Sequence, residues 1–377
     1  RAAHRHQLGA ARRIHPDLQR ALRAGRSGHG VDAARGDPKI LCDSVQDYLL
    51  IARPADDPVY RVIRDRPRLL RPGRGCTPLE QALPFRLEQP LLAVGGHMKN
   101  TIALAWDDRI VISPHIGDMG SARSLDVFEQ VVSDLQALYQ VRAEAILCDA
   151  HPGYATTRWA ERSGLPRHAV LHHHAHAAAV MAEYNIVEPV IGITWDGTGY
   201  GTDGTIWGGE FFVGDYGGFR RAAHLEYLPM PGGDAAIRYP WRLALGYVYA
   251  LTGELPDLAP TSAEPGQSIS EQEKRIIRQQ VDRHLNTPLT SAAGRLFDAV
   301  AALIGIRHRV TYEAQAAIEM EMLASAHKGP ATRRAVYPFA LEPGDDGDRA
   351  ALLRLHLLLA LSAGPGAAAE RFRHQRP

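Results

Sequence analysis

The pattern of hydrophobic and polar positions is regular between Leu91 and Leu341 and irregular toward both ends. Apolar residues recur every three or four positions over 124–141, which predicts an amphipathic helix. Short apolar runs at 143–149 and 188–196 predict buried strands. Between 90 and 118, apolar runs alternate with a glycine turn and an Asp-Asp turn, which predicts three antiparallel strands.

The remainder of this central region adds helices to the strands. Residues 156–164 form a short helical pattern that stops at Gly164, and a second helical pattern runs through "AHAAAVMAEY". A glycine-rich hairpin is predicted after residue 196, and residues 239–326 are mostly helical in pattern. Because strands alternate with helices and hairpins come first, we expect an α/β fold with mixed sheets and helical insertions.

Both ends of the sequence differ from the central region in composition and periodicity. Residues 1–47 are rich in Arg, Ala and His without a steady period, and residues 48–78 are extended and dense in arginine. After Leu341 there is one helix-like Leu/Ala patch and then small residues, arginine and proline. Only four of the 43 basic residues are lysines, which is typical of GC-rich coding DNA. We therefore expect 1–47 and 342–377 to be disordered or out-of-frame segments, with a basic arm or a C-terminal helix as alternatives.

Composition excludes several classes of protein. The 377 residues contain 43 basic and 42 acidic side chains, so the balance of charge favours neither a nucleic-acid partner nor a membrane surface. No apolar run reaches the roughly 18–20 residues of a membrane span. The three cysteines include no CxxC pair, so neither a disulfide framework nor a zinc finger is predicted. We expect a cytoplasmic protein.

The densest chemical signal is the run "HHHAH". His172 and His176 are four positions apart, so on a helix their imidazoles share one face, as a metal ion requires. Asp196 ends an apolar strand, where α/β sheets place their ligand sites, and it is our candidate third ligand. Neutral imidazoles and a carboxylate suit Fe²⁺ and Zn²⁺ alike. The alternative is a surface histidine cluster without function.

A second signal is "WDGTGYGTDGTIWGGE". Its glycines allow a backbone to approach a phosphate closely, which makes this hairpin a candidate nucleotide site. It is neither a P-loop nor a GxGxxG motif. It resembles the phosphate hairpins of the actin and sugar-kinase (ASKHA) ATPase fold, as does "GGHMKNT", where Lys99 is a candidate phosphate contact.

Two weaker signals follow. In "PMPGGDAAIRYPWR", Asp234 is presented after a glycine turn, and Arg238 and Arg242 could pair with an anion. In "GRLFDAVAALIG", Gly294 permits close approach and Asp298 is a candidate ribose contact. A capping Asp and a solvated helix Asp are the alternative interpretations. No serine or thiol nucleophile is evident, so nucleotide- and metal-assisted group transfer is the predicted chemistry.

Taken in order, these motifs, with "SPHIGD", "CDAHPGYATTRWA" and "YEAQAAIEME", resemble the HypF carbamoyltransferases of [NiFe]-hydrogenase maturation. The resemblance runs from about Tyr48 to Leu341. It implies an ASKHA-type carbamoyltransferase domain over 85–341, preceded at 48–84 by the end of a YrdC-like domain and its connector, with Arg53 and Asp57 as remnants of that domain.

The resemblance also implies a reaction. ATP and carbamoyl phosphate give carbamoyl adenylate, and the carbamoyl group then passes to the C-terminal cysteine of the partner HypE, as precursor of the cyanide ligand. A divalent metal, Fe²⁺ or Zn²⁺, would be held by His172, His176 and Asp196, with Asp196 the best catalytic candidate. ATP with Mg²⁺ would contact Lys99, Gly197, Thr198, Gly199, Gly201, Gly208, Gly209, Asp234, Gly294 and Asp298.

The sequence departs from the family pattern in ways that bear on activity. The family's early domains and its late Ser-Gly-Gly-Val-Phe-Gln-Asn and Asp-Gly-Gly segments do not occur, and Tyr239 stands where the family usually has Glu. We therefore expect a fragment that is truncated at the C-terminus. The competing hypotheses are a non-catalytic module that binds a nucleotide or a partner, and an O-carbamoyltransferase that acts on a small-molecule hydroxyl.

Overall fold

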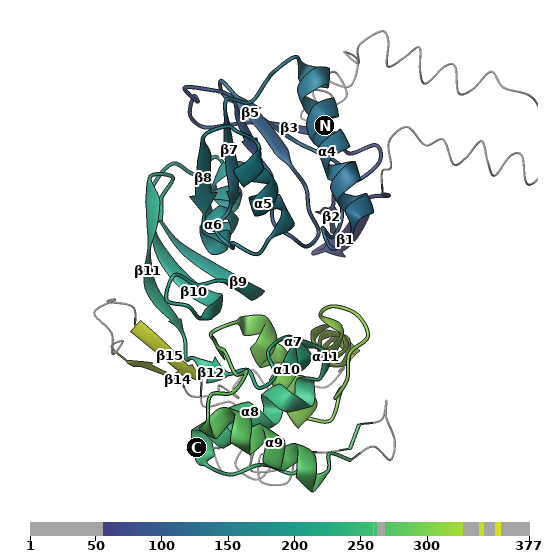
Figure 1. The fold of residues 1–377 in the computed structure, drawn as a ribbon, viewed down its shortest axis with the longest axis vertical. Coiled ribbons are helices and arrows are strands. Elements are labelled where there is room, and N and C mark those ends of the chain that lie inside the picture. The colour runs from purple at the N-terminus through teal and green to yellow at the C-terminus, as the bar shows by residue number, and fades with distance from the viewer. Residues whose placement is uncertain (1–55, 259, 262–267, 327–338, 343–350, 356–377) are drawn as a thin grey trace, which may run out of the picture. The chain divides into compact units, whose positions relative to one another are not determined.

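The structure, a computed structural model, describes residues 56–258, 260–261, 268–326, 339–342 and 351–355 (Figure 1). All of these residues belong to one compact unit that begins at Ala55. The predicted N-terminal segment 1–47 and Arg53 lie outside the described residues, as does most of the predicted tail.

The arginine-dense stretch near the start forms an exposed hairpin. Strands β1 (Val59–Ile63) and β2 (Arg66–Arg71) pair antiparallel, and nearly every residue of both is exposed. The carbonyl of Asp57 accepts hydrogen bonds from the Arg71 guanidinium at 3.1 and 3.3 Å. Asp57 therefore secures the end of this hairpin.

A six-stranded mixed sheet follows, and it confirms the predicted meander. Its central strands β4 (Leu91–Ala93), β5 (Ala103–Trp106) and β6 (Arg109–Ile112) pair antiparallel in sequence order. The sheet is completed by β3 (Leu79–Ala82) on β6, and by β7 (Ala145–Asp149) and β8 (Arg167–Val170), which run parallel to β4. Parallel strands β4, β7 and β8 therefore end at one edge, which is where Asp149 lies.

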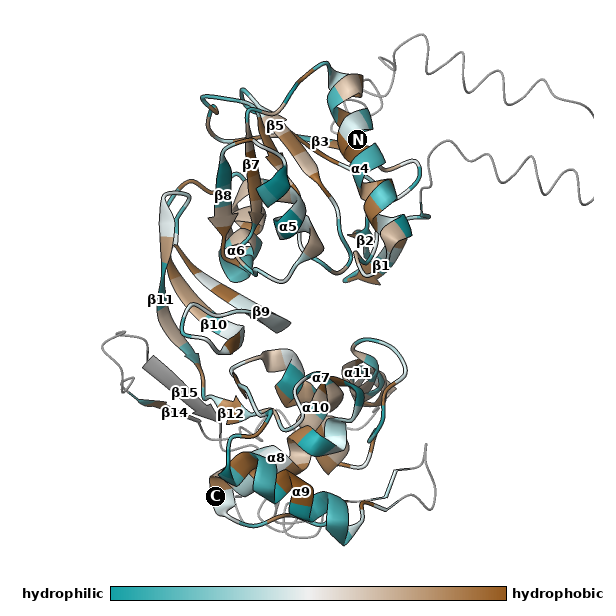
Figure 2. Ribbon diagram, viewed as in Figure 1, coloured by the Kyte–Doolittle hydropathy of each residue, from teal (hydrophilic) through white to brown (hydrophobic). Residues whose placement is uncertain are grey.

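Helices α4 (Ala122–Tyr139) and α5 (Ala155–Arg162) pack on this sheet (Figure 1). The α4 helix begins where the Ser121 side chain accepts the backbone N–H of Ser124 in a capping box, which satisfies an otherwise unpaired donor. Figure 2 shows hydrophobic and hydrophilic residues alternating along α4, as the predicted amphipathic helix requires. Its apolar face buries Phe128, Val132 and Leu135 in the core of the sheet.

A seven-stranded mixed sheet forms the rest of the framework. The long strands β9 (Val190–Tyr200), β10 (Ile206–Asp215) and β11 (Gly218–Leu225) are antiparallel neighbours, so the predicted glycine hairpin is confirmed between β9 and β10. The shorter strands are β12 (Leu228–Pro229), β13 (Leu289–Thr290), β14 (Phe339–Glu342) and β15 (Ala351–Leu355).

The prediction that residues 188–196 form a buried strand was wrong in one respect. Residues 190–196 do form the first part of β9, but Ile191, Ile193 and Trp195 are 73%, 58% and 59% exposed. Side chains alternate between the two faces of a strand, and only one face of β9 packs on helix α6 (His172–Glu183), with Gly192 against Ala177. The other face is largely exposed at these three side chains.

The prediction for the tail after Leu341 also needs a correction. The helix-like Leu/Ala patch begins with strand β15, which pairs parallel with β11 and antiparallel with β14. Apolar runs of this length fit a strand or a helix equally well, and the pairing partners decide between them. Apart from Glu342, which ends β14, the rest of 342–377 lies outside the described residues.

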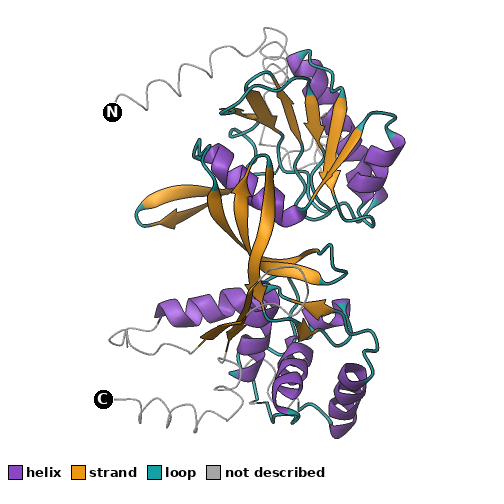
Figure 3. Ribbon diagram, turned by 90° about the vertical axis from the view of Figure 1, so that its left-hand side faces the viewer, coloured by secondary structure: helices purple, strands orange, loops and turns teal. Residues whose placement is uncertain are grey.

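The helical region confirms the prediction for 239–326 (Figure 3). Helix α8 (Pro240–Thr252) packs on α10 (Ala293–Leu303) through Tyr247 and Ala299 among others, and on α9 (Glu271–Asp282) through Leu245 and Ile277. Helices α7 (Asp234–Arg238) and α11 (Gln315–Ala326) flank them. The fold is thus the expected mixed α/β type. None of the described helices combines the length and apolarity needed to span a bilayer.

Phe128 provides a test of the first core. Its side chain is fully buried and meets Trp159 edge to face, with ring centroids 5.2 Å apart. Phe128→Ala should lower the free energy of unfolding by about 3–5 kcal/mol, because it leaves a cavity. Leu138→Ala on the same helix, 41% exposed, should cost less than about 1 kcal/mol. Denaturant titration measures both, and similar losses would contradict this core assignment.

Candidate functional site

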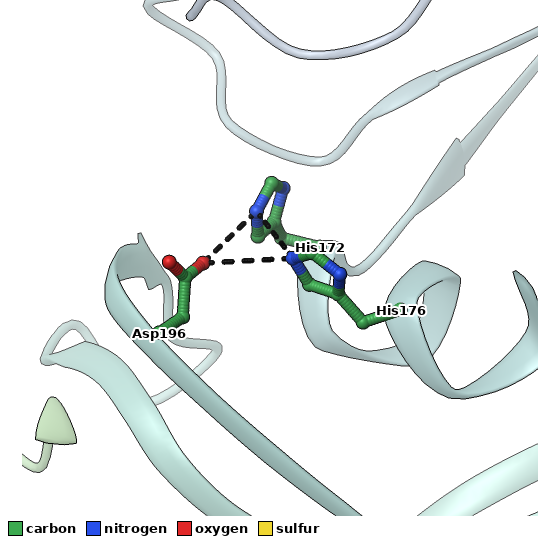
Figure 4. A group of neighbouring side chains, drawn as sticks. All are labelled: His172, His176 and Asp196. Atoms are coloured by element: carbon green, nitrogen blue, oxygen red, sulfur yellow. Dashed lines mark hydrogen bonds and ion pairs between the residues drawn. The ribbon is translucent and has the colours of Figure 1, made fainter. Parts of the chain in front are cut away.

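The predicted metal ligands converge from two elements (Figure 4). His172 is the first residue of α6 and His176 lies one helical turn later, so both imidazoles project from one face of the helix. Asp196 lies on β9 and faces them. The Nε2 atom of His172 is 3.1 Å from Asp196 Oδ2 and 3.2 Å from His176 Nε2.

These three side chains fit a divalent cation. One ligand atom from each lies within 4.8 Å of the others, and two imidazoles with a carboxylate are donors that Fe²⁺ and Zn²⁺ accept. His172 and Asp196 are partly buried, whereas the His176 side chain is 56% exposed. Three protein ligands would leave at least one coordination position of such an ion for water or substrate.

The same contacts shift two pKa values in opposite directions. Hydrogen bonds to Asp149 and Asp196 raise the pKa of His172 to about 9, against the effect of burial. Burial raises the pKa of Asp196, but hydrogen bonds from His172, His176 and the Gly197 N–H outweigh it and hold that pKa well below 3.8. Without a metal the site is therefore a charged pair, and a metal ion would displace the proton of His172.

Asp149 is a site residue that the sequence analysis did not single out. It is the last residue of β7, 7% exposed, and its Oδ2 lies 2.9 Å from His172 Nδ1. The rule that selected Asp196, an acidic residue at the end of an apolar strand, also describes Asp149 in "AILCD". Tyr154 lies beside this pair, and burial together with the charges of Asp149 and Asp196 raises its pKa to about 12.

His173 packs against the hairpin and lies outside the group of three converging ligand atoms. Its ring is fully buried, and neither ring nitrogen has a hydrogen-bond partner among the described residues. Burial lowers the pKa of His173 to about 4, so it is neutral at physiological pH. A Cβ atom on Gly199 would lie 2.2 Å from His173 Cε1, so this glycine is required by the close approach of the ring.

Gly208 and Gly209 also serve packing. Both backbone N–H groups donate to Glu210 Oε1, at 3.1 and 3.2 Å, so these donors are already engaged and the idea that they bind a phosphate gains no support. A Cβ on Gly208 would lie 2.8 Å from Ala292 Cβ, and one on Gly209 would lie 2.3 Å from the Ser291 carbonyl oxygen. The glycines let β10 pack directly on the segment that leads into α10.

Glu210 is a fully buried carboxylate with a complete set of partners. Arg221 on β11 donates to its Oε2 at 2.6 Å, and Ser291 donates to its Oε1. Arg221 also donates to Asp203 at the tip of the hairpin. Asp203 accepts bonds from Thr205, Trp207 and Tyr227 as well, and although burial raises its pKa, these bonds lower it to about 2.

The start of α10 packs against the hairpin backbone. A Cβ on Gly294 would lie 2.8 Å from Gly197 Cα, so no side chain fits between the two segments. Arg295, buried beside Gly197, pairs with Asp298 at 2.8 Å, and its Nε has no partner among the described residues. Burial raises the pKa of Asp298 to about 6, against the effect of Arg295. Arg295 is a second residue that the sequence analysis missed.

Other predicted contacts lie elsewhere or at the margin. The Lys99 ammonium, a predicted phosphate contact, forms an ion pair with Glu313 at 2.8 Å. Asp234 is exposed in the first turn of α7, whose N-cap is Gly233, so it is not the capping residue. Thr198 is exposed on β9, and the Gly201 N–H donates to Thr205 within the hairpin. Arg242 donates to the Pro231 carbonyl and to Gln280, which holds the loop before α7.

Comparison with known families matches two successive parts of the chain. Residues 86–183 match the HypF Kae1-like domain, and residues 192–372 match the second subdomain of the carbamoyltransferase Kae1-like domain. The second match extends beyond Leu341, where the resemblance found in the sequence ended.

Individual relatives agree. The chain is 40% identical over 284 residues to carbamoyltransferase HypF of Synechocystis sp., covering 72% of this chain and 37% of that protein. It is 41% identical over 252 residues to a carbamoyltransferase HypF homolog of Cupriavidus necator, covering 65% of this chain and 62% of that protein. The chain thus spans less than two thirds of the length of these relatives.

Solved structures show the same fold. Full-length HypF in its phosphate- and nucleotide-bound form superposes with a TM-score of 0.71 at 37% identity, covering 81% of this chain and 46% of that one. HypF of T. kodakarensis gives a TM-score of 0.70 at 30% identity, covering 86% of this chain and 41% of that one. The fold is therefore of the Kae1-like, ASKHA-type class. Within that class, the chain belongs to the HypF family of carbamoyltransferases.

Gly199→Ala tests the packing of the hairpin on His173. The added methyl would overlap the imidazole, so we expect a loss of about 1–3 kcal/mol in the free energy of unfolding. Gly120→Ala is the matched control, because a Cβ there meets nothing within 4 Å, and it should change stability by less than about 0.5 kcal/mol. His173→Ala should relieve part of the loss in the double variant, and strictly additive effects would argue against direct contact.

His173 also predicts a pH dependence in the metal-free protein. Its pKa is about 4 in the folded protein, against an ordinary value of 6.5, so between these values the unfolded chain binds a proton that the folded chain does not. Stability from this group is complete above pH 6.5 and is lost as the pH falls toward 4. Relative to His173→Leu, the wild type should lose stability over this window. Parallel stability curves for the two proteins would refute the assignment.

Proposed function

We propose that this chain carries the carbamoyl-transfer site of a HypF-type enzyme in [NiFe]-hydrogenase maturation. ATP and carbamoyl phosphate, with water, give carbamoyl adenylate, pyrophosphate and phosphate. The carbamoyl group then passes to the thiol of the C-terminal cysteine of HypE, with AMP as the leaving group. The observation that carries the proposal is the convergence of His172, His176 and Asp196 beside a glycine hairpin that packs on the start of α10.

The three ligands define where the transferred group would be activated. His172, His176 and Asp196 would hold a divalent ion, which would supply Lewis-acid activation of a phosphate or carbamoyl oxygen. Asp196 remains ionised because three donors lower its pKa, and His172 projects its Nε2 toward the same point. These residues bind and orient, and they leave the outer side of the site, beside the exposed His176, open to substrate.

The start of α10 is the proposed phosphate position. The first N–H groups of a helix attract anions, and Arg295, which is buried and paired with Asp298, places its guanidinium close to Gly197. The match to a HypF structure described as phosphate- and nucleotide-bound supports a nucleotide as the ligand, and its position at α10 is our proposal. ATP, with Mg²⁺, would therefore lie against Gly197, Gly294 and Arg295. Holding nucleotide and acceptor in fixed positions would supply much of the acceleration.

The test is the transfer itself. The chain is incubated with ATP, radiolabelled carbamoyl phosphate and HypE, together with a separately produced YrdC-like domain, and the HypE C-terminal cysteine is analysed by mass spectrometry. Metal content is measured in parallel. His176→Ala and Asp196→Asn should each reduce both the bound metal and the yield of labelled HypE. The reduction should exceed the roughly 10–100-fold that follows when a hydrogen-bond partner of a ligand, rather than the ligand itself, is removed.

His168→Ala is the matched control, because His168 is an exposed histidine on β8. It should behave as wild type. Wild-type chain that binds metal and nucleotide yet leaves HypE unlabelled would instead be a non-catalytic binding module. Label found on a small-molecule hydroxyl rather than on HypE would assign the chain to O-carbamoyl transfer.

A further inference from the structure

We infer that Asp149 is the positioning residue of the metal centre: it fixes the tautomer and the ring orientation of His172, so that Nε2 is the nitrogen offered to the metal. This inference rests on the metal centre proposed above. It adds a residue from the six-stranded sheet to a site whose expected ligands come from α6 and β9.

The geometry has the order of a carboxylate, an imidazole and a metal position. Asp149 Oδ2 lies 2.9 Å from His172 Nδ1, and the opposite ring nitrogen, Nε2, lies 3.1 Å from Asp196 Oδ2. A carboxylate can only accept a hydrogen bond, so in the metal-free protein each ring nitrogen offers a proton to the carboxylate that it faces. A metal ion would displace the proton at Nε2, while Asp149 keeps the proton at Nδ1 and so leaves the lone pair at Nε2 for the ion. Partners of this kind raise the basicity of the ligand and hold its ring in place.

The Asp149 side chain and backbone are themselves fixed by hydrogen bonds. Its Oδ1 accepts the backbone N–H of His151 at 2.8 Å, and its carbonyl oxygen accepts the Thr157 hydroxyl at 3.0 Å. It is the last residue of β7 and is 7% exposed. A carboxylate with both oxygens engaged cannot rotate to follow His172, so the imidazole must adapt to the carboxylate.

The Asp149 side of the pair is also shielded from water, since the Asp149 side chain is 5% exposed and that of His172 is 29% exposed. A Cβ on Gly96 would lie 3.9 Å from His172 Cε1 and 4.0 Å from Asp149 Oδ2, and Tyr154 lies against the same point. A hydrogen bond is electrostatically stronger in such a low-dielectric position than in water. His176 is the contrast, because its side chain is 56% exposed. His172 therefore provides the fixed ligand, and His176 can adjust to the ion.

The discriminating variant is Asp149→Asn. Asparagine keeps the shape and can still accept the His151 N–H with its amide oxygen, but its NH₂ group then donates to Nδ1 and moves the imidazole proton to Nε2, where it blocks the metal. We expect the Zn²⁺ affinity of this variant, measured by competition with a chromophoric chelator, to be about 10–100-fold lower than that of the wild type. The affinity of Asp149→Ala should be no lower than that of Asp149→Asn. Without metal, the Asn variant should unfold at a midpoint close to that of the wild type, which shows that the loss of affinity is not a loss of folding.

Asp107→Asn is the matched control. Asp107 has a left-handed backbone conformation that asparagine tolerates, and its exposed side chain pairs with Arg86 at a turn of the same sheet. Its Zn²⁺ affinity should equal that of the wild type. Wild-type affinity in Asp149→Asn would overturn the inference. Failure of the wild type to bind Zn²⁺, or unchanged binding in His176→Ala, would instead overturn the proposed metal centre.

A measurement on the unaltered chain does not depend on how the variants fold. Long-range ¹H–¹⁵N correlation of the histidine rings in the Zn²⁺-loaded protein reports which nitrogen carries the proton. We expect His172 to be protonated at Nδ1 and bound to metal through Nε2. A His172 ring that binds metal through Nδ1 would refute the role assigned to Asp149.

Discussion

The buried carboxylate of Glu210 is the constraint on which the site geometry depends. It is fully excluded from water, and its charge is compensated by Arg221, Ser291 and the N–H groups of Gly208 and Gly209. These partners come from β10, β11 and the segment leading into α10, so one anion joins three elements. Removing a partner from such a group leaves a buried charge unpaired, which typically costs about 3–5 kcal/mol. The hairpin that presents Asp196 is held in place by this network.

Much of the fold and the centre of the site follow from local patterns. The helix at α4, the antiparallel strands β4 to β6 and the hairpin after Asp196 each have a period or a turn that sequence displays directly. The spacing of His172 and His176 on a helix fixes their common face. Asp149 obeyed the same strand-end rule as Asp196, but its histidine partner His172 lies 23 positions later, and only the fold brings the two together.

The remainder depends on contacts between distant segments. A glycine-rich motif does not reveal whether its N–H groups are free, and Glu210 already occupies those of Gly208 and Gly209. An apolar run such as 188–196 does not show how many of its faces are covered. Lys99 pairs with Glu313, which is more than two hundred positions away, and no local pattern predicts this.

The origin of the ligands gives the metal a second role. His172 and His176 follow β8 of the six-stranded sheet, whereas Asp196 belongs to β9 of the seven-stranded sheet. An ion held by all three would act as a removable cross-link between the sheets. Any ligand whose binding alters their spacing would then alter metal affinity, and the metal would alter the affinity of that ligand by the same factor. If the nucleotide is such a ligand, bound metal would change nucleotide affinity by the same factor as bound nucleotide changes metal affinity.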